Sequence, residues 1–308
     1  MYGENAVDDI KKFGKAILSN QVARTAPKFY ASVTKYTGRG YGKFSPLEVA
    51  QYFQERFDEY FKKLEINKSD IRQYLSGKRL LEYYPGDVPG VAILMYAHGA
   101  EHITCINRFP LITHTDTNVE IMSELINNLE GEARKRVHSC FLKSNDPGSG
   151  VNTSAIEYIV KPQGSAGLES QIDMVYSGAA LEHVTDLDAT FIDMYKMLVP
   201  GGVAIHQVDL KSHGMHRKNS LDFLTWPQWM WELMYSHKGV PNRWRINRYR
   251  EIIEQSAFEL ALLEPISLYS SAIISEVKPY LIEKFKHISD EDLAWAAFWL
   301  VLHKKIQN

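Results

Sequence analysis

The sequence predicts an α/β fold with a doubly wound, mostly parallel β-sheet. From residue 79 to residue 209, short strand-like runs of apolar residues alternate with stretches of helical periodicity. Turns rich in proline and glycine, such as Pro85–Gly90 and Pro200–Gly202, separate these runs. Such alternation is typical of parallel sheets, because each crossover helix returns the chain to the same end of the sheet.

The first clearly marked element is a helix in the N-terminal third. Ser45-Pro46-Leu47-Glu48 has the form of a capping box with proline at the first helical position. Apolar residues then recur at steps of three and four as far as Leu64, which predicts an amphipathic helix that packs on a larger body. We therefore expect residues 1–75 to form a helical N-terminal cap.

A strand–turn–helix–strand unit follows. Arg79–Tyr84 and His102–Asn107 have the composition of short buried strands, and Val91–His98 between them predicts an apolar helix. The remaining predicted elements are helices over Asn118–Leu129 and Asp186–Leu198, a loop over Ser144–Gly150, and strands over Ala155–Val160, Gln171–Tyr176, Val203–Asp209, Phe258–Leu268 and Trp295–His303. We expect one domain over 76–308, in which 210–257 is a lid inserted after the fifth strand.

Composition excludes several classes of protein. The chain has 308 residues, with 35 Lys+Arg against 37 Asp+Glu and a net charge of -2, so a basic nucleic-acid-wrapping protein is not expected. No apolar run approaches the roughly 20 residues that span a bilayer, and the N-terminus lacks the apolar core of a secretory signal. The only cysteines, Cys105 and Cys140, cannot build a disulfide framework. We expect a cytoplasmic protein with no membrane partner and no metal site.

The first strand–helix turn is the candidate ligand site. Ligands of such sheets bind outside the carboxyl ends of the strands, and glycine lets a ligand approach the backbone. Gly86 and Asp87 lie in this turn, and Asn107 followed by Arg108 ends the next strand, where a ribose-binding residue is usual. The dinucleotide pattern G-x-G-x-x-G is absent. The turn alone is compatible with NAD, FAD, S-adenosylmethionine or a plain tight connection.

Four segments together resemble the motifs of class I S-adenosylmethionine-dependent methyltransferases. They are Leu81–Asp87, Ile172–Ser177, Ala180–Val184 and Leu198–Gly202. The order and spacing of the segments are also similar, and the resemblance covers roughly residues 75–308. It implies a Rossmann-like methyltransferase fold with a seven-stranded sheet and S-adenosylmethionine as the cofactor.

The resemblance also implies roles for individual residues. Glu82 would orient the first loop and the amino group of the cofactor, and Asn107 would face its ribose. The implied cofactor-binding set is Glu82, Tyr84, Gly86, Asp87, Asn107, Arg108, Ser177 and Gly178. The sequence departs from the family at three positions, since glycine is usual where Tyr84 and Val88 stand and an acidic residue is usual where Asn107 stands.

Candidate catalytic residues follow the fifth strand. A hydroxyl acceptor must lose a proton, and histidine suits proton transfer near pH 7. His206 and Asp209 lie on the predicted strand and His213 in the loop after it. Strand alternation places Asp209 and His213 nearer the predicted substrate than His206, for which a core position is an equal alternative.

A second cluster lies in the predicted lid. Trp226, Arg243, Arg245 and Arg248 form an aromatic and cationic group that suits a planar or anionic substrate. A core stripe with a solvated cationic face is the structural alternative, and RNA stacking is the functional one.

These observations predict methyl transfer to a hydroxyl, or to an amine, of a small molecule. A methyltransferase that acts on RNA or protein stays open. So does a member of the fold that binds the cofactor without transferring methyl, or that has no activity. The sequence leaves a homodimer open.

Overall fold

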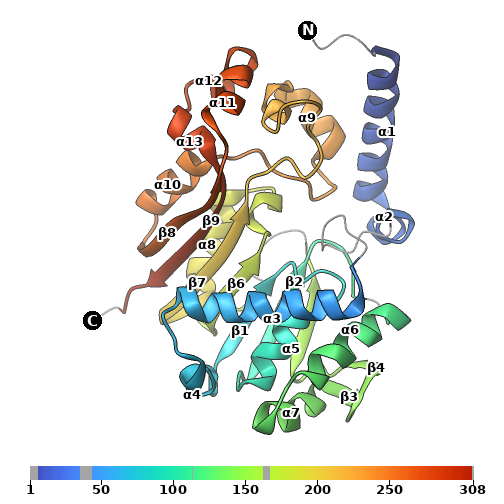
Figure 1. Ribbon diagram of the computed structural model, residues 1–308, viewed down its shortest axis with the longest axis vertical. Helices are drawn as coiled ribbons and strands as arrows, with labels where there is room; N and C mark the ends of the chain where they lie inside the picture. Colours follow the sequence, from blue (N-terminus) through green and yellow to red (C-terminus); the bar gives the residue numbers. More distant parts are fainter. Residues whose placement is uncertain (1–5, 35–43, 113, 162–166, 307–308) are drawn as a thin grey trace.

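The structure is a computed structural model, and it describes residues 6–34, 44–112, 114–161 and 167–306. A mixed β-sheet forms its centre (Figure 1). The strands are β1 (Arg79–Tyr83), β2 (His102–Asn107), β3 (Phe141–Lys143), β4 (Asp146–Val151), β5 (Ile156–Val160), β6 (Ile172–Gly178), β7 (Leu198–Asp209), β8 (Phe258–Leu268) and β9 (Trp295–Lys304). The described strands form one seven-stranded sheet in the order β5-β2-β1-β6-β7-β9-β8, and a separate pair, β3-β4.

The helices surround this sheet. They are α1 (Ala6–Thr25), α2 (Pro27–Thr34), α3 (Pro46–Lys63), α4 (Ile71–Leu75), α5 (Gly90–Ala97), α6 (Asp116–Asn127), α7 (Gly131–Val137), α8 (Leu187–Met197), α9 (Gln228–Tyr235), α10 (Ile246–Gln255), α11 (Ser271–Val277), α12 (Glu283–Lys286) and α13 (Asp290–Ala294). Short 3-10 turns, among them η3 (Leu181–His183) and η4 (Asp222–Thr225), join some of them.

The sheet is parallel except for β9, which runs antiparallel to β7 and β8. This arrangement is the Rossmann-like methyltransferase fold that the sequence predicts, with β1 central and paired to β2 and β6. The strand order reverses at β1, because β2 and β5 extend the sheet on one side and β6 and β7 extend it on the other. In open α/β sheets ligands bind at this reversal.

Helices cover both faces of the sheet. On one face, α3, α5 and α6 bury a continuous apolar cluster against the strands, and the α3 side chains Phe53 and Phe57 belong to it. On the other face, α8 and α10 pack against β6, β7 and β9. The predicted capping box of α3 is confirmed, since Glu48 N donates to the Ser45 side chain and Ser45 N donates to Glu48.

A third apolar cluster forms above the sheet. It joins η4 and α9 to α11, α12 and α13, which lie between β8 and β9 in the sequence. Helix α1 packs beside α9, as Figure 1 shows, and the Asn20 amide donates to the Leu233 carbonyl of α9 at 2.9 Å. We call η4, α9 and α11–α13 together the lid.

Two local expectations differ from the structure. Residues Ser144–Gly150 were expected to form a loop, but β4 starts at Asp146 and pairs with β3 as an antiparallel hairpin. The glycines gave no alternation of apolar residues from which a strand could be recognised. Strand β7 also begins at Leu198 rather than Val203, because Ile172 pairs with Leu198 before a register shift.

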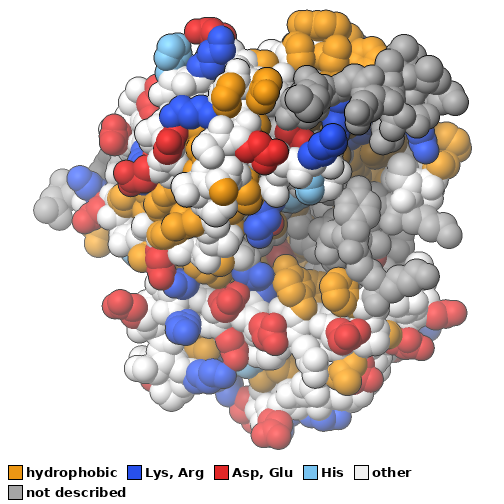
Figure 2. Space-filling view, turned by 45° about the horizontal axis from the view of Figure 1, so that its top comes forward, with side chains coloured by type: hydrophobic (Ala, Val, Ile, Leu, Met, Phe, Trp, Pro, Cys, Tyr) orange, Lys and Arg blue, Asp and Glu red, His pale blue; other side chains and the backbone are white. Residues whose placement is uncertain are grey.

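The surface shows no segregation of charge on the face drawn in Figure 2, where acidic and basic side chains are mixed. Among the described helices, none combines the length and the apolar character that crossing a bilayer requires.

Candidate active site

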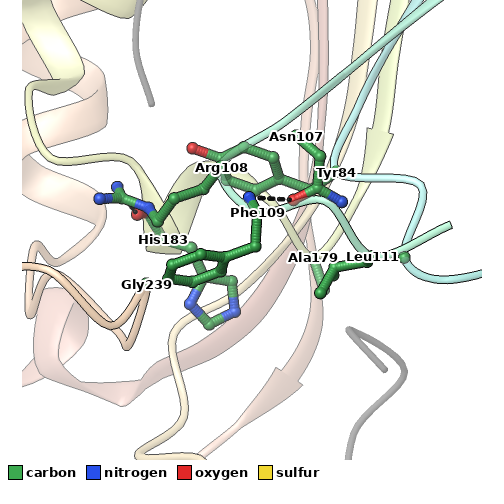
Figure 3. A pocket seen from close by; sticks show the side chains of 9 residues that line it. Tyr84, Asn107, Arg108, Phe109, Leu111, Ala179, His183 and Gly239 are labelled. Atoms are coloured by element: carbon green, nitrogen blue, oxygen red, sulfur yellow. Dashed lines mark hydrogen bonds between the residues drawn. The ribbon is translucent and has the colours of Figure 1, made fainter. Parts of the chain in front are cut away.

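Two adjoining pockets open at the carboxyl ends of β1, β2 and β6. The central pocket is lined by Tyr84, Gly86, Asn107, Arg108, Phe109, Leu111, Ala179, His183 and Gly239 (Figure 3). The second, which we call the Arg56 pocket, is lined by Tyr52, Phe53, Arg56, Tyr60, Glu82, Tyr84, Pro85, Val91 and Gly178. Tyr84 belongs to both, so the two pockets form one groove along this edge of the sheet.

In the turn after β1, Tyr84 has a backbone conformation that usually favours glycine. Tyr84 has φ 56° and Gly86 has φ 80°, both in the left-handed region. A residue with a Cβ costs roughly 1–2 kcal/mol there, which the surrounding fold must offset. Tyr84 therefore preserves the backbone path that glycine usually supplies, and its side chain becomes part of the groove wall.

Glu82 carries a buried carboxyl at the end of β1. Its Oε2 accepts a hydrogen bond from the Tyr176 hydroxyl at 3.3 Å, and the Cys105 thiol lies 3.9 Å from the same oxygen. Burial raises the pKa of Glu82 to about 8, so this carboxyl is largely protonated at pH 7. A cation placed beside it would favour the carboxylate.

Arg56 enters the same pocket from α3, and nothing in the sequence marked it. Its side chain is 13% exposed, and its Nη1 lies 2.9 Å from Glu59 Oε2. The buried Nε has no hydrogen-bond partner among the residues that the structure describes. A cation and a titratable carboxyl thus line one small pocket, which is the arrangement that a zwitterionic amino-acid group requires.

Asn107 ends β2 as expected and lies in the central pocket. Its Oδ1 accepts from Phe109 N at 3.4 Å, which Figure 3 marks, whereas its buried Nδ2 has no partner within the described chain. The adjacent Arg108 donates through Nη2 to the His183 carbonyl at 3.1 Å and to Thr185 Oγ1 at 2.8 Å. Arg108 therefore ties the end of β2 to η3, while Asn107 keeps a donor for a ligand.

Other residues of the predicted cofactor set divide between the groove and the core. Gly86 and Gly178 line the groove. Asp87, which follows Gly86 in the sequence, is buried. Ser177 is fully buried, and its hydroxyl lies 2.7 Å from His206 Nδ1, its cross-strand neighbour on β7. Burial lowers the pKa of His206 to about 3, so this imidazole is neutral. The structure favours the core position for His206.

His213 and Asp209 lie in a second polar cluster beside the groove. His213 Nε2 is 3.8 Å from Asp209 Oδ2 and 4.0 Å from Glu182 Oε1, and His183 Nε2 is 3.9 Å from the same Glu182 oxygen. Burial raises the pKa of Glu182 well above its usual range and lowers that of His213. Sequence reasoning had placed Glu182 only in a motif, because its approach to His213 depends on how β6 and β7 end side by side.

The predicted arginine cluster is mostly internal. Arg243 donates through Nη1 to the carbonyls of Trp226 at 2.7 Å and Phe223 at 3.3 Å. Arg245, which is 1% exposed, donates to the carbonyls of Leu210 at 2.7 Å, Leu293 at 3.3 Å and Trp295. These guanidiniums hold lid segments together instead of facing the groove, so we do not carry them into the site.

The other two residues of the predicted cluster, Arg248 and Trp226, contact other side chains. Arg248 forms ion pairs at 2.6 Å with Asp188 and Glu251, and Trp226 stacks under the Arg217 guanidinium, 4.7 Å from it. A third pocket, which we call the lid pocket, is lined in part by Trp231, Trp244 and Lys284. Lys284 and Arg108 are cations of this pocket, and Lys284 Nζ lies 3.6 Å from the centre of the Trp244 ring. Burial lowers the pKa of this lysine to about 8.

Comparisons with known proteins agree on the fold and identify no activity. No protein-family model and no curated protein matches the chain. A methyltransferase from Mesorhizobium loti, described as S-adenosylmethionine dependent, is 15% identical and has a TM-score of 0.42, with 76% of this chain and 96% of that chain covered. The [4+2]-cyclase SpnF is 14% identical with a TM-score of 0.40, covering 78% of this chain and 80% of its own.

Phosphoethanolamine N-methyltransferase 2 of Haemonchus contortus, in complex with S-adenosyl-L-methionine, is also similar. It is 15% identical with a TM-score of 0.39, and the match covers 75% of this chain and 49% of that chain.

The internal role of Arg245 predicts a difference in stability from Arg248. Arg245→Gln leaves three buried carbonyls without a donor and should lower the free energy of unfolding by about 3 kcal/mol. Arg248→Gln removes two ion pairs whose carboxylates are about half exposed, and it should cost only about 1 kcal/mol. Urea denaturation of both variants measures the contrast, and equal losses would contradict the assignment.

Proposed function

We propose that the chain is a class I S-adenosylmethionine-dependent methyltransferase that methylates a hydroxyl, or an amine, of a small anionic or aromatic metabolite. The observation that supports it most is the pairing of Glu82 and Arg56 in one pocket, next to Asn107 and the β1 turn. Glu82 and Arg56 suit the amino-acid end of the cofactor, and Asn107 and the β1 turn suit its nucleoside end.

The Arg56 pocket would hold the amino-acid end of the cofactor. The Glu82 carboxylate would accept from the ammonium group, and the unpartnered Arg56 Nε would donate to the carboxylate. Gly178 leaves room between them, since a Cβ at this position would lie 3.4 Å from the Tyr60 hydroxyl oxygen and 3.6 Å from Arg56 Cδ.

The central pocket would hold the nucleoside end. Asn107 Nδ2 is available to a ribose hydroxyl, and the Tyr84–Gly86 turn would let the ligand lie against backbone. S-adenosylmethionine supplies a methyl group that its sulfonium already activates, so the protein needs chiefly to align an acceptor and exclude water.

The acceptor would enter through the lid pocket. This pocket shares Arg108, His183 and Gly239 with the central pocket, so it leads to the groove. Trp231 and Trp244 offer aromatic walls, and Lys284 offers a cation, which together suit an aromatic or anionic molecule. At the inner end, Glu182, His183 and His213 present Lewis-basic atoms where the acceptor must be activated.

Binding of S-adenosylhomocysteine tests the groove directly. Isothermal titration calorimetry of the wild-type protein should give a single site. Glu82→Gln and Arg56→Gln should each weaken binding by about 10- to 100-fold, because each removes a charged hydrogen bond worth roughly 1.5–3 kcal/mol.

Arg72→Gln is the matched control for Arg56→Gln. Arg72 lies on α4 with a side chain that is 63% exposed, and its nearest acid, Glu132, is 3.9 Å away. Its replacement should leave the affinity unchanged. No binding to the wild-type protein, or equal affinities for all four proteins, would reject the proposed function.

Cofactor binding should also release a proton through Glu82. Burial raises the pKa of Glu82 to about 8, and a bound ammonium would favour the ionised form. The affinity should therefore rise between pH 6 and pH 8, by at most tenfold per pH unit. Calorimetry at pH 7 in two buffers of different ionisation enthalpy measures the released proton. Release that persists in Glu82→Gln would exclude Glu82 as its source.

A further inference from the structure

The polar cluster beside the groove contains a buried carboxyl that the fold leaves unsatisfied. Glu182 is 1% exposed, and neither of its oxygens has a hydrogen bond of good geometry among the described residues, although the backbone N–H groups of Glu182 and Asp209 act on its carboxyl. A buried carboxyl without partners costs free energy that native structures rarely tolerate. Its ion-pair neighbours within the described chain are the imidazoles of His183 and His213, each at about the same distance.

The imidazoles are also incompletely satisfied. His213 Nε2 and His183 Nδ1 are buried atoms without hydrogen-bond partners in the described residues. The two rings lie 4.9 Å apart, and one ligand atom from each of Glu182, His183 and His213 falls within 4.8 Å of the others. His213 moreover holds φ 49°, a left-handed conformation that costs free energy for a side chain of this size.

A fourth group of the same kind adjoins them. Asp209 Oδ2 is 3.8 Å from His213 Nε2, and its carboxylate raises the pKa of Glu182 further by repulsion, after the larger effect of burial. The described cation nearest to Asp209 is Lys211, 3.7 Å away on a half-exposed side chain. Two carboxyls and two imidazoles therefore converge, and the cations Lys211 and Arg108 act on them from the edge of the cluster.

We propose that Glu182, His183 and His213, with Asp209 as a fourth ligand, bind a divalent transition-metal ion such as Zn²⁺ or Fe²⁺. Imidazole nitrogens together with carboxylate oxygens select these ions over Mg²⁺ and Ca²⁺, which prefer oxygen ligands alone. Atoms bound to such a metal at about 2.0–2.2 Å lie roughly 3.4 Å apart. The gaps of 3.8–4.0 Å need an inward shift of a few tenths of an ångström at each atom, and the widest gap, which is up to 4.8 Å, needs a shift of up to about 0.7 Å at each atom.

The position of the cluster gives the ion a role. Glu182 and His183 come from η3 at the end of β6, and Asp209 and His213 come from the end of β7 and the loop after it. His183 lines both the central and the lid pockets, so one side of the cluster opens toward the acceptor. A metal with an open position there would bind an acceptor oxygen.

This assignment changes the role of His213. Its Nε2 would hold the metal instead of removing a proton directly, and the sequence-based expectation that the chain has no metal site would be wrong. The role in activating the acceptor rests on the proposed function. Metal binding itself does not, because the ligands all belong to this chain.

Titration with Co²⁺ tests the site. The full-length protein is freed of metal with a chelator and titrated with Co²⁺, while visible absorption is recorded. We expect one equivalent to bind with the absorption of a low-coordinate Co²⁺ site, to be displaced by Zn²⁺, and to be unaffected by Mg²⁺. Absence of a stoichiometric site would overturn the proposal.

Variants locate the ion. Glu182→Gln keeps the size of the side chain, and His213→Ala changes a residue that is one quarter exposed. Each should weaken Co²⁺ binding by about 100-fold, because loss of a direct ligand costs at least as much as loss of an outer-shell partner. His213→Ala provides the test if circular dichroism shows that Glu182→Gln fails to fold. Wild-type affinity in a folded ligand variant would overturn the proposal.

Two controls separate the outcomes. His287→Ala removes an exposed His–Glu pair, in which His287 Nε2 lies 3.2 Å from Glu283 Oε1, and should leave Co²⁺ binding unchanged. Equal loss in this variant would overturn the site by showing that surface pairs bind the ion. Calorimetry with S-adenosylhomocysteine on the same samples tests the proposed function independently. Cofactor binding without Co²⁺ binding rejects the metal site alone, and the reverse result rejects the methyltransferase alone.

Discussion

The parallel pairing of β1 with β2 on one side and β6 on the other is the constraint on which the groove depends. Its register places Glu82 directly between Cys105 and Tyr176. Both neighbours are donors to the Glu82 carboxyl, so the sheet itself positions this group. One residue further along β6, Ser177 pairs with His206 of β7, so the register of the sheet also places this polar pair. Because all the parallel strands end at one edge, the groove, η3 and the loop that carries His213 also meet there.

The buried polar groups differ in how far the described chain satisfies them. Arg243 and Arg245 are buried, but several backbone carbonyls accept their hydrogen bonds. Arg56, Asn107 and Glu182 are buried with donors or acceptors that the described chain does not use. Hydrogen bonds to carbonyls offset the free-energy cost of burying a guanidinium. A buried polar atom without such a bond costs free energy unless a ligand supplies the missing hydrogen bond. Arg56, Asn107 and Glu182 lie along the groove and beside it, whereas other buried atoms without partners in the described chain, such as the Tyr249 hydroxyl and Nε of Arg243 and Arg245, lie elsewhere.

The sequence predicted the parts of the fold that local pattern controls. Each of the seven sheet strands was predicted within a few residues, because alternating strand and helix runs and the proline–glycine turns mark their limits. The hairpin of β3 and β4 was missed, since Gly148 and Gly150 lie in β4 where alternating side chains would mark a strand. The segment after β8 was left unassigned, yet α11–α13 complete the lid.

The site could be predicted only where its residues follow the strands. Glu82, Gly86 and Asn107 end or follow β1 and β2, so a motif and the topology place them at the groove. Arg56 comes from the polar side of α3, and Lys284 reaches the lid pocket from α12, so neither has a local signal. The arginine-rich stretch of the lid was predicted to face a substrate, but composition cannot distinguish a guanidinium that binds carbonyls from one that binds a ligand.

The central claim is that the carboxyl edge of the sheet holds S-adenosylmethionine between Arg56 and Asn107. A crystal structure of the protein with S-adenosylhomocysteine tests it most directly. The account predicts the amino group of the ligand at Glu82, its carboxylate at Arg56 and its ribose hydroxyls at Asn107. A ligand bound elsewhere, or bound in the groove with its amino-acid end away from Glu82 and Arg56, would contradict the account.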